Sequence, residues 1–87
     1  MAHFARIENT IVQQVVVVKN EVLENKPFPE SEPMGIAFLK TLYGENTEWL
    51  QTSYNENFRG KYAGSGMIYD PTKDEFTYPV SIEEVTE

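Results

Sequence analysis

The 87-residue sequence contains no cysteine and a single histidine, His3. The absence of cysteine excludes disulfide bonds, a thiolate nucleophile and a zinc–thiolate site, and it is compatible with a reducing compartment. No acid or cysteine accompanies His3 at metal-ligand spacing, so we expect its side chain to be exposed or to face a sheet. We therefore expect no metal and no catalytic centre based on histidine.

The sequence also lacks long apolar runs and an excess of basic residues. Its longest aliphatic run, residues 15–18, is far shorter than the roughly 20 residues that span a bilayer. The first residues lack the basic and apolar regions of a secretion signal. Seven basic and fourteen acidic residues give a net charge of −7, which repels nucleic-acid phosphates and anionic membranes. We expect a soluble, unsecreted protein that binds neither nucleic acid nor membrane.

The residues that are present suffice for one small core. Hydrophobic residues make up 40% of the chain and aromatic residues 13%, although a chain of this length buries only about 60–65% of its unfolded surface. We predict a single globular domain over residues 1–80 and an acidic C-terminal tail over residues 81–87. The tail has three glutamates and too few apolar side chains to pack alone.

Alternating and β-branched residues predict an N-terminal hairpin. Residues 2–7 and 11–18 are its expected strands, joined by a turn at residues 8–10. Residues 19–20 predict another turn, after which residues 21–23 either continue the sheet as a short strand or end it.

A proline-rich loop over residues 24–33 leads into a predicted helix over residues 32–43. Ser31 is the expected N-cap, and Gly44 the expected left-handed residue after the last turn. Gly35 either weakens the first turn by about 1 kcal/mol relative to alanine or marks a close contact with the sheet. The apolar stripe expected to face the sheet comprises Met34, Ile36, Phe38, Leu39, Leu42 and Tyr43.

Three further strands are predicted over residues 47–54, 61–69 and 75–80, with a loop at residues 55–60 and a proline turn at residues 70–73. Together with the hairpin they predict an α+β fold, a small antiparallel sheet of four to five strands with one packed helix. The alternative is a partly open small β-barrel with one helix.

Two segments have features of ligand-binding loops. Gly64 and Gly66 could cradle a phosphate, but such a cradle needs a helix directly after it, and a strand is predicted there. We interpret these glycines as clearing one strand face for crossing aromatic rings or as permitting a bulge. The acidic turn at residues 70–73 is too short for a calcium loop and contains proline and lysine. We therefore expect no cofactor and no metal.

Basic and aromatic residues interleave in one segment, residues 54–62. Arg59 and Lys61 there form either a partner-binding edge or a structural pair, with Arg59 packed over a ring and Lys61 protecting an edge strand. Trp49 is either part of an aromatic platform or the anchor of the core. The candidate interaction surface comprises Trp49, Tyr54, Phe58, Arg59, Lys61 and Tyr62.

Three segments, MAHFARIE…VQQVVVV, GIAFLKTLYG and TEWLQTSYNENFRGKYAGSGMIYDPTKDEF, resemble short uncharacterised proteins of marine tailed phages, cyanophages especially. The likeness covers residues 1–76, and its most specific motifs are WLQTSYN, NFR and YAGSGMIYD. It implies a viral source, and relatives of this kind are sometimes placed among virion structural proteins. The chain departs from the pattern at its end, where it reads SIEEVTE in place of a proline- and tryptophan-rich extension.

The sequence thus predicts a non-catalytic phage protein, a structural or assembly component that acts through protein–protein contacts in the host cytoplasm or the virion. The alternative is a small acidic phage regulator that binds a host protein. Aromatic residues on both faces of several strands predict a homo-oligomer, most simply a dimer. No enzymatic activity is expected.

Overall fold

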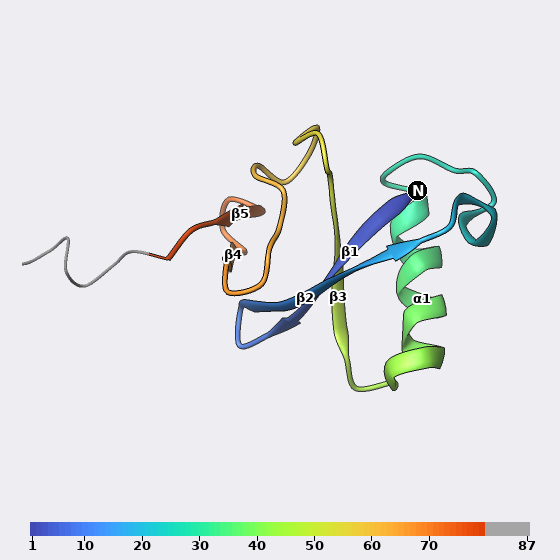
Figure 1. Ribbon diagram of the computed structural model, residues 1–87, viewed down its shortest axis with the longest axis horizontal. Helices are drawn as coiled ribbons and strands as arrows, with labels where there is room; N and C mark the ends of the chain where they lie inside the picture. Colours follow the sequence, from blue (N-terminus) through green and yellow to red (C-terminus); the bar gives the residue numbers. More distant parts are fainter. Residues whose placement is uncertain (80–87) are drawn as a thin grey trace, which may run out of the picture.

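The chain begins with the predicted β-hairpin (Figure 1). The structure is a computed structural model that describes residues 1–79. Strand β1 (Ala2–Glu8) pairs antiparallel with strand β2 (Ile11–Val18). Asn9 and Thr10 connect them with φ values of 54° and 65°, and a two-residue turn between twisted strands requires such positive values. The hairpin prediction is confirmed.

A five-stranded antiparallel sheet is built around this hairpin, in the order β3-β1-β2-β4-β5. Its other strands are β3 (Glu48–Thr52), β4 (Ile68–Asp70) and β5 (Glu75–Thr77). Strands β3 and β5 are the outermost strands, and the sheet is open between them. The predicted α+β fold is therefore confirmed, and the sheet does not close into the alternative barrel.

Helix α1 (Ser31–Tyr43) packs against one face of the sheet. Gly35 lies directly on the Phe4 ring, because a Cβ atom at this position would be only 2.1 Å from Phe4 Cζ. This glycine marks the close contact between helix and sheet. Leu39 is 2% exposed and belongs to the core, whereas Leu42 is 63% exposed. The predicted apolar stripe is therefore wrong at Leu42.

The start of the helix also differs from the prediction. Glu30 is the N-cap residue and makes no side-chain capping hydrogen bond. The hydroxyl of the buried Ser31 instead donates to Gln51 Oε1 at 2.7 Å, because folding brings β3 beside the first turn of α1. Before the loop, the short 3-10 helix η1 (Asn20–Leu23) forms where one expectation was a short strand.

Apolar side chains are buried on both faces of the sheet. On the helix side the buried cluster comprises Ala2, Phe4, Val18, Leu23, Leu39 and Trp49. On the opposite side it comprises Ala5, Ile7, Val12, Ala63, Met67 and Phe76. Alternate residues of a strand point to opposite faces, so β1 contributes to both clusters. The chain after β3 crosses the second face and covers part of it.

The chain between β3 and β4 is mostly irregular, although a strand is predicted over residues 61–69. Only its end enters a strand, at Ile68. Gly66 has a φ value of 91°, and Met67 N–H donates to Gly64 O at 3.0 Å, so the glycines form a tight turn. A Cβ atom on Gly66 would meet nothing within 4 Å. The ring-crossing interpretation of these glycines is therefore wrong.

The predicted proline turn after β4 is confirmed. Asp70 Oδ1 accepts the backbone N–H groups of Thr72 at 2.9 Å and Lys73 at 3.3 Å. Strands β3 and β5 are shorter than predicted. The predicted acidic tail over residues 81–87 lies outside the described residues.

Candidate protein interface

The six candidate interface residues lie in different environments. Trp49 is 3% exposed, and its indole N–H donates to Thr47 Oγ1 at 2.8 Å, so it is an anchor of the helix-side core rather than part of a surface. Lys61 is exposed, and its ammonium lies 5.7 Å from the centroid of the Tyr78 ring. The other four residues belong to two separate clusters, Tyr54 with Tyr62 and Phe58 with Arg59.

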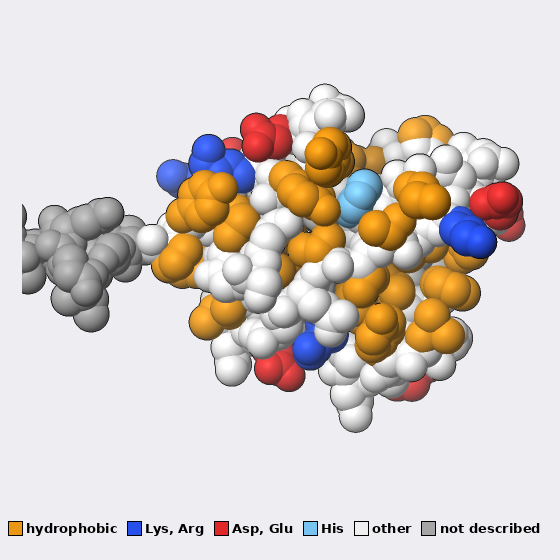
Figure 2. All heavy atoms as spheres, in the orientation of Figure 1, with side chains coloured by type: hydrophobic (Ala, Val, Ile, Leu, Met, Phe, Trp, Pro, Cys, Tyr) orange, Lys and Arg blue, Asp and Glu red, His pale blue; other side chains and the backbone are white. Residues whose placement is uncertain are grey.

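Tyr54 and Tyr62 surround His3 on the sheet face opposite helix α1. The ring centroids are 5.8 Å apart for His3 and Tyr54, 5.5 Å for His3 and Tyr62, and 5.2 Å for the two tyrosines. Val17 of β2 is the cross-strand partner of His3 and therefore shares this face. We call His3, Tyr54 and Tyr62 the aromatic patch. Figure 2 shows the histidine among hydrophobic side chains on the molecular surface.

The aromatic patch is open to solvent and uncharged near neutral pH. Tyr54 is 67% exposed and Val17 is 52% exposed, while His3 and Tyr62 are half-buried. Burial lowers the pKa of His3, and the positive charge of the amino terminus lowers it further. The patch therefore offers contact area rather than an acid–base pair. The sequence could not reveal it, because only the fold brings the tyrosines over β1.

Arg59 is the centre of an ion-pair cluster with Glu32 and Asp74, of which the Asp74 side chain is 56% exposed. The Arg59 side chain is 10% exposed, and that of its partner Glu32 is 17% exposed. Burial lowers the pKa of Arg59, but hydrogen bonds and charges from Glu32 and Asp74 outweigh burial and raise it, so the guanidinium stays charged. The guanidinium lies 5.4 Å from the centroid of the Phe28 ring, which stacks on Phe58 at 3.7 Å. The expectation that Arg59 packs over a ring is confirmed.

Asp74 closes this cluster from the turn between β4 and β5. The Tyr69 hydroxyl donates to Asp74 Oδ1 at 2.6 Å, and Arg59 Nε donates to the same oxygen at 2.8 Å. These hydrogen bonds hold the pKa of Asp74 below its ordinary value. Burial and the bond to Asp74 raise the pKa of Tyr69. The cluster therefore connects helix α1 with the hairpin formed by β4 and β5.

The same ion pair covers the outer edge of β3. Gln51 N–H donates to Glu32 Oε2 at 2.8 Å, and Gln51 O accepts a hydrogen bond from Arg59 Nη1 at 3.0 Å. Glu32 and Arg59 thus occupy the backbone positions at which a further strand would bond. Because these charges are satisfied within the molecule, Arg59 is a structural residue rather than an exposed anion-binding group.

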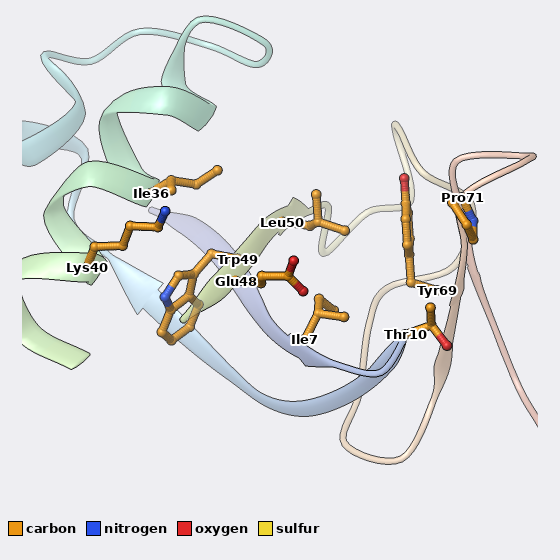
Figure 3. Close-up of a pocket in the computed structure, with 9 residues that line it drawn as sticks. All are labelled: Ile7, Thr10, Ile36, Lys40, Glu48, Trp49, Leu50, Tyr69 and Pro71. Carbon is orange, nitrogen blue, oxygen red and sulfur yellow. The ribbon is translucent and has the colours of Figure 1, made fainter. Parts of the chain in front are cut away.

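An apolar groove of about 400 Å³ lies beside the start of β3. Figure 3 shows Ile36 and Lys40 of the helix on one side, and Tyr69 and Pro71 on the other. Its charged lining groups are Lys40 and Glu48. The groove has the size and lining to accept an apolar side chain. The sequence pattern does not indicate this groove, because its walls come from separate segments of the chain.

Within residues 1–79, no three His, Cys, Asp or Glu side chains are grouped as metal ligands would be. The part of the chain that the structure describes also has no helix with the length and apolarity needed to cross a bilayer. Comparisons with protein-family models, curated proteins and solved structures found no match to this chain. The exposed surfaces are therefore the features from which a function can be inferred.

Proposed function

We propose that this protein is a non-catalytic structural or assembly component of a phage, acting through protein–protein contacts in the host cytoplasm or the virion. The observation that carries this proposal is the aromatic patch with Val17 beside it, an uncovered apolar area on one sheet face. Tyrosine is enriched in protein interfaces because its ring gives a large contact area and its hydroxyl still forms hydrogen bonds. The resemblance to marine phage proteins suggests the biological setting.

Two equally exposed tyrosines provide a matched test. Tyr54 is 67% exposed and lies in the patch, whereas Tyr78 is 66% exposed and lies outside it. We expect the wild-type protein and Tyr78→Ala to be present at fixed stoichiometry in purified phage particles, and Tyr54→Ala to be depleted from them. Equal incorporation of the two variants would show that the patch is not the contact surface. Absence of the wild-type protein from particles would contradict the structural role.

A small acidic regulator that binds a host protein is the second candidate, and the net charge of −7 favours it. Salt distinguishes the two functions, because binding to a basic partner weakens as ionic strength rises, whereas a contact through the uncharged patch changes little. Early expression, together with a host partner that is released by salt, would support the regulator instead.

A further inference from the structure

Among residues 1–79, the second half of strand β2 has no hydrogen-bonded backbone neighbour on its outer side. Strand β2 pairs with β4 at a single residue pair. Next to that pair, Val12 N–H donates to Met67 O and Val12 O accepts from Gly66 N–H, both at 2.8 Å. Beyond these bonds, no backbone partner for the outer side of residues 14–18 lies within the described chain.

The hydrogen-bond ladder shows which groups on this edge are free. Both backbone groups of Gln51 point away from β1, so the residue opposite it, Phe4, must bond to β2, where its partner is Val16. Successive residues in an antiparallel strand direct their backbone groups to opposite sides. The N–H and C=O groups of Val15 and Val17 therefore point outward.

The two outermost strands of the sheet are each covered at one position on their outer sides. Glu32 and Arg59 cover β3 at Gln51. On β5, Phe76 N–H donates to the backbone oxygen of Arg59 at 3.1 Å. An uncovered strand edge is a site at which another extended chain can add to a sheet. The outer side of residues 14–18 has this property.

The composition of β2 fits pairing with a second copy of the same strand. The strand contains no charged residue and no proline, although the whole chain has a net charge of −7. It is therefore a neutral edge at which two acidic chains can approach. Residues 15–18 are all valine, so antiparallel self-pairing of residues 14–18 places Val15 opposite Val17 and Val16 opposite Val16, with Gln14 opposite Val18 at each end.

We propose that two copies of the protein pair antiparallel through residues 14–18 of β2 and join their sheets into one. This inference rests on the proposed function and identifies a second copy as a partner. A two-fold axis perpendicular to the sheet keeps the same face of both copies on the same side of the joined sheet. Both helices therefore lie on one side and both aromatic patches on the other. Val17 lies beside the seam on the patch side and adds apolar contact between the two copies.

Substitutions of Val17 test the pairing, because its side chain is 52% exposed and its replacement leaves the core filled. Val17→Lys places like charges near the two-fold axis and should weaken dimerisation about tenfold or more. The matched control Val17→Thr keeps the β-branched shape and should remain dimeric. Val17→Glu alone should also be monomeric, and an equimolar mixture of the Lys and Glu variants should recover the dimer. Light scattering measures the mass against the 10.0 kDa chain.

Amide hydrogen exchange gives a readout in the unmodified protein. The Val15 and Val17 amides should exchange more slowly as protein concentration rises, whereas the Val16 amide, bonded to β1, should be protected at every concentration. A wild-type mass of 10.0 kDa at millimolar concentration, or a dimer unaffected by Val17→Lys, would overturn the pairing. A monomer that is still incorporated into phage particles would leave the proposed function standing, and a dimer absent from particles would contradict that function alone.

Discussion

Replacing Gly35 with alanine has two opposite effects on the free energy of unfolding: it raises helix propensity and it crowds the contact with Phe4. At an exposed position inside a helix, glycine to alanine stabilises a protein by about 1 kcal/mol. At Gly35 the added Cβ would lie 2.1 Å from Phe4 Cζ and 2.7 Å from each Phe4 Cε atom. Carbon atoms prefer separations of about 3.5–4.0 Å, so the ring or the helix must shift by more than about 1 Å to relieve the contact.

The Phe4 ring has little freedom to move, because it is 0% exposed and surrounded by the helix-side core. Overpacking a filled core costs about 1–3 kcal/mol, and contact with three ring atoms places Gly35→Ala near the upper end of that range. Subtracting the gain in helix propensity leaves a net loss of about 2 kcal/mol. For a domain of this size, the thermal midpoint should fall by about 8–16 °C.

Thermal and urea denaturation measure this loss directly. Ala37→Gly, at an exposed position of the same helix, is the control and should cost about 1 kcal/mol through propensity alone. In a Phe4→Leu background the shorter side chain leaves room for a Cβ, so Gly35→Ala should lose most of its penalty, which a double-mutant cycle detects. A Gly35→Ala protein at least as stable as wild type would refute the close contact between helix and sheet.

Three other changes probe the core, the turn before β4 and the ion-pair cluster. Leu39→Ala should cost about 2–4 kcal/mol in urea denaturation because the side chain is 2% exposed, whereas Leu42→Ala, at 63% exposed, should cost about 0.5 kcal/mol or less. Gly66→Ala should lower stability by about 1–3 kcal/mol because its φ is 91°. Gly64→Ala adds only an ordinary 3.6 Å contact and should cost less. An equal loss of stability in both variants would contradict the role of the positive φ at Gly66. The pKa of Asp74 lies below its ordinary value of 3.8, so its stabilisation is present above that pH and is lost as pH falls through the folded value. In Asp74→Asn the thermal midpoint should therefore fall less steeply as the pH is lowered through this range. An unchanged fall at acidic pH would show that Asp74 is not the group responsible.

Elements whose formation depends on neighbouring residues could be predicted from the amino-acid sequence. The hairpin of β1 and β2 follows from β-branched runs flanking a short polar turn, and helix α1 follows from its apolar spacing between a proline-rich loop and Gly44. The turn after Asp70 follows from its local side-chain hydrogen bonds. These features could be predicted because their favourable interactions lie within a few residues of one another.

The way those elements join, and the surfaces that remain open, depend on tertiary contacts. Ser31 bonds to Gln51 rather than capping the helix, and the predicted interface divides because Trp49 is drawn into the core while Arg59 is bound by Glu32. Patterns of residue type do not encode these outcomes, because they depend on contacts between segments far apart in the chain. The free edge of β2 arises in the same way. Strand β4 begins only at Ile68, directly after the turn at the glycines, and pairs with β2 at one position.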